Sequence, residues 1–133
     1  MHLIDTKFAI YLRDVDPEIS ARIDALPTRP KLSLLSWVEL EGGIHTDQDN
    51  AIRRRTNLDA MLDLLEIVPF DDAVVRAYAH IVAMCGFSRP RILDRLIAGS
   101  AIVNGLTLIT INASDFREIP GLALEIWPAP SAQ

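Results

Sequence analysis

The stretch LIAGSAIVNGLTLITINAS, residues 96–114, contains no charged side chain, and its length raises the question of a membrane-spanning helix. Asn104-Gly105 interrupts the stretch, and Asn-Gly is a strong turn signal. Thr107, Thr110 and Asn112 add further polar groups to it. We therefore predict a buried helix, a turn and a buried strand, and we expect a soluble cytoplasmic protein.

The same alternation of short apolar segments and helical patterns runs along the whole chain. The predicted strands are Leu3–Ile4, Leu32–Leu35, Ile67–Val68, Leu106–Ile111 and Leu124–Trp127. The predicted helices are Phe8–Leu12 with Thr6 as its cap, Pro17–Leu26, a helix from Ser36 that contains Trp37, Leu40 and Ile44, Asp49–Glu66, Asp71–Met84 and Arg91–Val103. Gly42-Gly43 either ends the helix that begins at Ser36 or lets another backbone come close to it. Strands that alternate with helices indicate an α/β fold with a mostly parallel central sheet between two helical layers. We expect one domain over residues 1–127 and a flexible tail over residues 128–133.

Composition excludes several classes of protein. A chain of 133 residues, half of them hydrophobic, forms one globular domain with a sizeable core. The net charge of −5 argues against binding to nucleic acid mainly through bulk charge. Cys85 is the only cysteine, which excludes an internal disulfide, and the three histidines lack the spacing of zinc ligands. Asp5 comes too early in the chain for a signal peptide.

Four acidic residues lie where an apolar segment passes into a helix or where a predicted helix begins: Asp5, Glu39, Asp94 and Asp115. In an open α/β sheet these positions converge on one crevice at the carboxyl edge of the strands. Carboxylates in one crevice repel one another unless a cation neutralises them. Clustered oxygen ligands suit Mg²⁺ or Mn²⁺, so the pattern indicates a metal site.

Each acid also has a simpler interpretation. Asp5 fits the N-cap of the helix that follows it, and Asp115 fits a first-turn acid favoured by the helix dipole. Ser36-x-x-Glu39 matches a capping box, although Gly42 and Gly43 would leave open space beside that carboxylate. The joint placement of the acids in one α/β frame favours the metal site.

Asp94 is the acid that a structural role explains least well. It shares its helix face with three apolar residues, Ile97, Ala98 and Ala101, where an ionised carboxylate is costly unless paired or metal-bound. The structural alternative is a salt bridge to Arg91 or Arg95.

The chain resembles the PIN-domain family, and in particular the VapC toxins of toxin–antitoxin pairs. The matching motifs span nearly the whole chain: Leu3-Ile4-Asp5-Thr6, Val38-Glu39-Leu40-x-x-Gly43, Ile92-Leu93-Asp94-x-x-Ile97-Ala98, Leu108-Ile109-Thr110-x-Asn112-x-x-Asp115-Phe116, and Ile119-Pro120-Gly121-Leu122 before Trp127. Their order and spacing carry the resemblance.

The resemblance implies an α/β/α fold and a Mg²⁺-dependent or Mn²⁺-dependent endoribonuclease acting on tRNA, rRNA or mRNA. It also implies a homodimer and a cognate antitoxin that covers the active site. The catalytic, metal-binding residues would be Asp5, Glu39, Asp94 and Asp115, supported by Thr6, Thr110 and Asn112. We expect Asp5 and Asp94 to bind the metal directly, and Glu39 and Asp115 to act partly through water.

Lys7 departs from the family pattern, which usually has Asn after Asp-Thr. Asn donates and accepts hydrogen bonds, whereas Lys only donates and brings a charge. Lys7 either pairs with Asp5 and competes with the metal, or points outward without effect.

Two groups of arginines are candidates for contacts with RNA or with a protein partner. Arg89, Arg91 and Arg95 are candidate contacts to RNA phosphates or ordinary solvated surface, and Arg53-Arg54-Arg55 indicates a solvated helix face or an antitoxin contact.

One alternative function is a catalytically silent PIN-fold module that acts through protein partners. A phosphate-accepting signalling domain would need a Lys soon after a late strand, but the lysines are Lys7 and Lys31.

Overall fold

The structure is a computed structural model, and it describes residues 1–131. These residues form a five-stranded sheet in the order β3-β2-β1-β4-β5, and every neighbouring pair of strands is parallel. The strands are β1 (His2–Ile4), β2 (Lys31–Ser33), β3 (Ile67–Val68), β4 (Thr107–Thr110) and β5 (Leu124–Ile126). The predicted α/β fold with a parallel sheet is confirmed.

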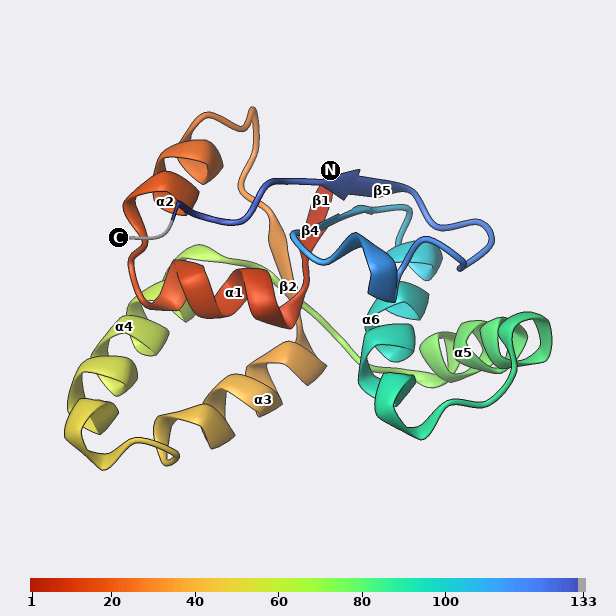
Figure 1. Ribbon diagram of the computed structural model, residues 1–133, viewed down its shortest axis with the longest axis horizontal. Coiled ribbons are helices and arrows are strands. Elements are labelled where there is room, and N and C mark those ends of the chain that lie inside the picture. Colours follow the sequence, from red (N-terminus) through yellow and green to blue (C-terminus); the bar gives the residue numbers. More distant parts are fainter. Residues whose placement is uncertain (132–133) are drawn as a thin grey trace.

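Helices cover both faces of the sheet (Figure 1). The α-helices are α1 (Thr6–Arg13), α2 (Pro17–Asp24), α3 (Leu34–Ile44), α4 (Ala51–Leu64), α5 (Asp72–Cys85) and α6 (Ile92–Val103). The described residues also form three short 3-10 helices: η1 (Gln48–Asn50) between α3 and α4, η2 (Arg89–Arg91) between α5 and α6, and η3 (Ala113–Asp115) after β4. None of the helices in residues 1–131 is both long and apolar enough to cross a membrane.

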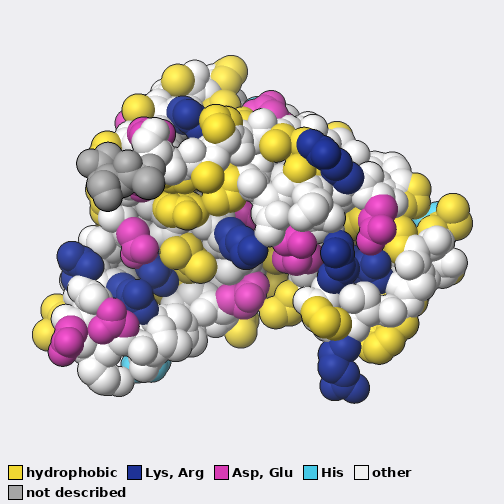
Figure 2. Space-filling view, in the orientation of Figure 1, with side chains coloured by type: hydrophobic (Ala, Val, Ile, Leu, Met, Phe, Trp, Pro, Cys, Tyr) yellow, Lys and Arg dark blue, Asp and Glu magenta, His cyan; other side chains and the backbone are white. Residues whose placement is uncertain are grey.

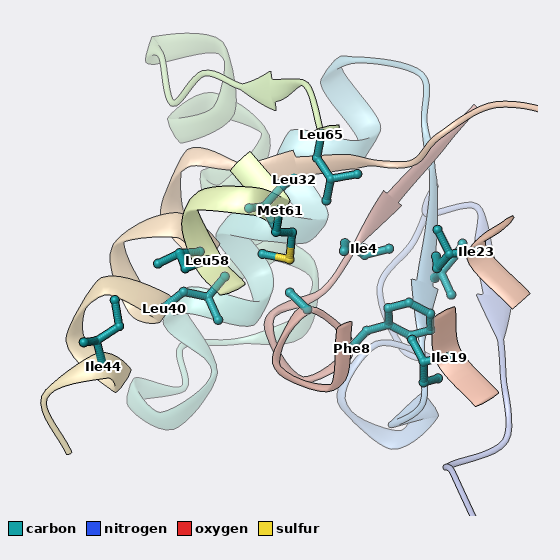
Figure 3. Close-up of a cluster of buried hydrophobic side chains, with 12 residues drawn as sticks. Ile4, Phe8, Ile19, Ile23, Leu32, Leu40, Ile44, Leu58, Met61 and Leu65 are labelled. Carbon is teal, nitrogen blue, oxygen red and sulfur yellow. The ribbon is translucent and has the colours of Figure 1, made fainter. Parts of the chain in front are cut away.

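Alternate residues of the strands serve two separate cores, as the period of two in a strand requires. On one face, Ile4 and Ile109 pack with side chains of α1 to α4, among them Phe8 (Figure 3). On the other face, Leu3 and Leu108 pack with side chains of α5 and α6. The central strands are therefore buried on both sides.

The register of the central strands brings the ends of β1 and β4 together. Ile4 pairs with Ile109, and the backbone N–H of Asp5 donates to the Ile109 carbonyl at 3.2 Å. Since the strands are parallel, Asp5 and Thr110 leave the sheet at the same carboxyl edge. This edge carries the polar residues that the sequence singled out.

Two predicted helix starts are wrong, and side-chain capping explains both. Asp5 rather than Thr6 is the N-cap of α1, because its Oδ1 accepts from the Phe8 N–H at 2.8 Å. Ser33 rather than Ser36 is the N-cap of α3, because its hydroxyl accepts from the Leu35 N–H at 3.1 Å. The predicted strand over Leu32–Leu35 therefore gives way to helix at Leu34.

The helix α3 contains Ile44 as predicted, and of the two alternatives for Gly42-Gly43 the one that ends the helix is wrong. A Cβ at Gly43 would lie 3.3 Å from a guanidinium nitrogen of buried Arg13, so this glycine lets the arginine approach. The other predicted helices differ from the observed ones only at their ends.

The described part of the C-terminal segment contacts α2. Arg22 donates to the Pro128 carbonyl at 3.1 Å, and the Ser131 N–H donates to Glu18 at 3.2 Å. Residues 132–133 lie outside the described part of the chain. The flexible tail expected over residues 128–133, and the domain boundary before it, stay predictions.

Candidate active site

Asp5 is the buried acid at the centre of the carboxyl edge. It is 3% exposed, and while its Oδ1 caps α1, its Oδ2 accepts from the Thr110 hydroxyl at 2.6 Å. The N-cap interpretation is thus correct, yet it uses only one of the two oxygens. The second oxygen ties β1 to β4 at the edge where the other acids gather.

Glu39 belongs to the same edge, and the capping-box interpretation of it is wrong. It lies inside α3, and its Oε1 accepts from the Thr6 hydroxyl at 2.7 Å. The Thr6 hydroxyl also lies 2.8 Å from the Ser36 hydroxyl, which is fully buried. The sequence pattern indicated Ser36 only as a cap, although its position one helical turn before Glu39 places both on one face of α3.

Asp115 lies in η3, immediately after β4. Its Oδ2 accepts from the Asn112 side-chain amide at 2.8 Å, and the Asn112 backbone N–H donates to the Thr110 hydroxyl at 2.9 Å. Thr110 and Asn112 therefore connect Asp115 to Asp5 through hydrogen bonds. The three predicted supporting residues, Thr6, Thr110 and Asn112, each contact one of the four acids.

Asp94 is a half-buried acid in the first turn of α6, and it forms no ion pair within residues 1–131. Arg91 lies 3.7 Å and Arg95 3.3 Å from the same oxygen of Glu118. The proposed salt bridge from Asp94 to Arg91 or Arg95 is therefore wrong, because both arginines are turned toward another carboxylate.

The four acids influence one another electrostatically. Burial and, after it, the neighbouring charges of Asp115, Asp5 and Glu39 together raise the pKa of Asp94 to about 6. Burial also raises the pKa of Asp5 against the lowering effect of its hydrogen bonds from Thr110 and Phe8. Figure 2 shows acidic side chains near the middle of one face, over the beginnings of α1 and α3 in Figure 1.

The acids suit a hard divalent cation by their chemistry. They offer only carboxylate oxygens, and a cation among them would relieve the repulsion that raises the pKa of Asp94. Within residues 1–131, no three Asp, Glu, His or Cys side chains are already arranged to hold an ion between them. The carboxylates would therefore have to turn inward when a cation binds.

Lys7 is exposed, and its charge still acts on the acids. It lowers the pKa of both Asp5 and Asp94, although no ion pair within the described residues joins it to either one. The structure thus combines the two interpretations of this residue: the side chain is solvated, and its charge reaches the site.

The three arginines near Asp94 differ in their availability for RNA. Arg95 is 3% exposed, and it donates to the Gly86 carbonyl and to Glu118. We correct the expectation for Arg95, because a buried guanidinium with internal acceptors does not face a ligand. Arg91 is partly exposed and bonded internally, whereas Arg89 is exposed.

Arginines of α4 also form ion pairs and hydrogen bonds with other residues of the chain. Arg55 binds Glu41 at 2.7 Å and Asp59 at 2.6 Å, and the hydrogen bond from Arg55 is the main reason why the pKa of Glu41 falls to about 2. Arg54 donates to the Gly43 carbonyl at 2.6 Å. These contacts join α4 to α3 and favour the solvated-face interpretation of this group.

A pocket of about 500 Å³ lies away from the acids, between α1, α2 and α4. Apolar side chains such as Leu12, Ile23 and Met61 line it, together with Arg13 and Arg29. None of the four acids reaches it, so the carboxylate cluster rather than this pocket is the candidate active site.

Known proteins share this fold and sequence pattern. The model of the PIN domain family matches residues 2–122. Ribonuclease VapC2 of Rickettsia felis is 27% identical over 133 residues, covering 96% of this chain and 98% of that protein. The tRNA(fMet)-specific endonuclease VapC of Salmonella typhimurium is 26% identical over 131 residues, covering 94% and 96%. A solved structure with a similar fold is that of VapBC2 from Rickettsia felis bound to a DNA fragment from its promoter. The TM-score is 0.82 at 25% identity, and the aligned region covers 95% of this chain and 98% of the chain in that structure. The chain therefore belongs to the PIN-domain family, and VapC proteins are its relatives within that family.

Proposed function

We propose that this chain is a VapC-type toxin, a metal-dependent endoribonuclease that hydrolyses RNA phosphodiesters and is neutralised by a cognate antitoxin. One observation carries the proposal: four carboxylates, from the N-cap of α1, from α3, from α6 and from η3, form one interacting cluster at the carboxyl edge of the sheet. The similarity to VapC ribonucleases over nearly the full length of the chain supports the same conclusion.

In this proposal Asp5 and Asp94 bind the cation directly, and Glu39 and Asp115 complete the site, partly through water. A bound divalent cation supplies charge neutralisation at the phosphate and a more acidic water. Thr110 orients Asp5, Thr6 orients Glu39 and Asn112 orients Asp115, each through a hydrogen bond to the carboxylate. Mg²⁺ is the cation we propose, with Mn²⁺ as its substitute.

The RNA, which would be a tRNA, an rRNA or an mRNA, approaches the edge where the acids lie. Phosphates are repelled by carboxylates, so cations around the cluster contribute to binding. Lys7 is exposed and its charge acts on the acids, and Arg89 is exposed in η2 before Asp94, so these two are the candidate phosphate contacts.

The partners in this proposal are an antitoxin and a second copy of the chain. The Rickettsia felis neighbour is a VapBC2 complex, which supports an antitoxin as partner. The pocket between α1, α2 and α4 offers that partner an apolar surface with two arginines at its wall. Exposed apolar side chains on α3, α5 and α6 (Val38, Met84 and Leu93) support self-association, which sedimentation of the purified chain would test.

The alternative is a PIN-fold module without catalysis, in which Lys7 keeps the cation out. Cleavage of RNA by the purified chain, with Mg²⁺ and with a chelator, separates the two functions. We expect cleavage that needs the cation and disappears in Asp94→Asn. Cation-independent cleavage, or equal cleavage by Asp94→Asn, would contradict the proposed site, and no cleavage by a folded chain that binds Mg²⁺ would favour the silent module.

A further inference from the structure

Asp94 and Asp115 are held near one another although both carry negative charge. Asp115 is the largest electrostatic cause of the raised pKa of Asp94. Like charges do not stay together through their own interaction, so other contacts must fix the η3 segment beside α6. The side-chain bond from Asn112 holds Asp115 within its own loop, but it does not join the loop to α6.

Phe116, next to Asp115, packs in the same apolar core as side chains of α6, and Arg91 adds a polar connection. Arg91 lies in η2 at the start of α6, and its Nη1 is 3.3 Å from the Ser114 carbonyl and 3.5 Å from the Asp115 carbonyl, in position to donate to both. Because Arg91 precedes Asp94 by three residues, the two share one side of the helical turn, and the loop bound by Arg91 lies over that side.

Glu118 also forms an ion pair with the Arg91 guanidinium. Its Oε1 lies 3.7 Å from Arg91 and 3.3 Å from buried Arg95, and Arg95 also donates to the Gly86 carbonyl. The pair of arginines and Glu118 thus joins α6, η3 and the end of α5. The Arg91 guanidinium binds backbone carbonyls and Glu118 instead of Asp94. Asp94 therefore has no ion-pair partner among the described residues.

We infer that Arg91 is a positioning residue of the acidic site, which fixes Asp115 opposite Asp94 by binding the backbone carbonyls of η3. The inference rests on the proposed function, since it concerns the cation that the acids would hold. It assigns Arg91 to the metal site through Asp115 rather than to direct contact with RNA. Outer partners of metal ligands affect metal affinity strongly when they are removed.

The direction in which the cation affinity changes when Arg91 is removed distinguishes a positioning role from a simple effect of its charge. Removing a positive charge beside an acidic site should tighten the binding of a cation if charge alone matters. Loss of positioning should weaken that binding, because Asp115 is no longer held where it assists Asp94. We expect Arg91→Ala to raise the Mn²⁺ concentration needed for half-saturation about 10-fold.

The measurement is a titration of Mn²⁺ against the full-length chain, followed by calorimetry and by the shift in melting temperature, without RNA. Arg117→Ala is the matched control, because Arg117 is an exposed cation close to the same loop. We expect its half-saturation to equal that of the wild type or to be lower. Arg91→Met keeps the aliphatic stem without the donors, and it serves if Arg91→Ala does not fold.

The outcomes are distinct. If Arg91→Ala and Arg91→Met bind Mn²⁺ as tightly as the wild type or Arg117→Ala, Arg91 does not position the site and only this inference is overturned. If Asp94→Asn also keeps wild-type binding, the acids are not the metal site, and the proposed function fails together with the inference. Weaker binding in both Arg91 variants, with Asp94→Asn weaker still, supports both.

Discussion

The Thr110 hydroxyl donates a hydrogen bond of 2.6 Å to the Asp5 carboxylate, joining two residues that are 105 positions apart. Both residues are buried at the ends of neighbouring parallel strands. The same hydroxyl accepts from the Asn112 N–H at 2.9 Å. A single side chain thus holds a carboxylate in place and fixes the start of the loop that carries Asp115.

Thr110→Val removes this hydroxyl at nearly constant shape. It removes the hydrogen-bond partner of the Asp5 Oδ2 and of the Asn112 N–H, and we expect it to reduce the free energy of unfolding by about 2 kcal/mol. Thr110→Ser is the control, because it keeps the hydroxyl. Urea unfolding of the three proteins measures the effect, and equal losses in the Val and Ser variants would show that the methyl group matters rather than the hydroxyl.

Asp94→Asn should abolish RNA cleavage while the metal-free protein stays at least as stable as the wild type. The change removes a proposed ligand charge and relieves repulsion from Asp115, Asp5 and Glu39. Asp63→Asn, on an exposed position of α4, controls for the loss of one acid. Wild-type cleavage rates in Asp94→Asn would remove this residue from the site.

The stability of the metal-free protein should increase as the pH falls through the pKa of Asp94. That pKa is raised to about 6 in the folded state, so the folded chain takes up a proton before the unfolded chain does. This stabilising contribution is complete below the ordinary aspartate pKa, and it is lost as the pH rises through about 6.

Unfolding in chelator at several pH values, for the wild type and Asp94→Asn, measures this dependence. The free-energy difference between the two proteins should narrow by roughly 1 kcal/mol toward acid pH, a value that allows for solvent screening of a half-buried group. A difference that does not change with pH would show that Asp94 has an ordinary pKa.

Lys7→Asn should bind Mg²⁺ more tightly and cleave RNA faster when the metal is limiting. Lys7 lowers the pKa of Asp5 and Asp94, so its charge also opposes a second cation at the same carboxylates. The gain should shrink at saturating metal, because a competing charge mainly affects occupancy. Lys7→Arg keeps the charge and should follow the wild-type curve, and superimposable curves for all three proteins would show that Lys7 has no effect on the metal.

Local sequence patterns were sufficient for the fold, and they also predict which acids form the site. Strands that are buried on both faces appear in the sequence as short apolar runs. The Asn104-Gly105 turn separates a helix from β4, as predicted. Asp5, Glu39, Asp94 and Asp115 were identified because each follows or opens such a segment. Parallel strand order then brings Asp5 and Asp115, which follow β1 and β4, to one edge by topology alone.

The tertiary structure alone decided how the polar side chains are paired. Ser36 and Glu39 match a local cap, yet Glu39 instead bonds Thr6 from a distant helix. Arg91 and Arg95 are the neighbours of Asp94 in sequence, yet both bind Glu118 in another loop. Sequence spacing limits only which residues can meet within one helix or strand. Packing between elements decides which of several oppositely charged or hydrogen-bonding groups a side chain contacts. Within residues 1–131, this packing leaves Asp94 without an ion-pair partner beside three other carboxylates.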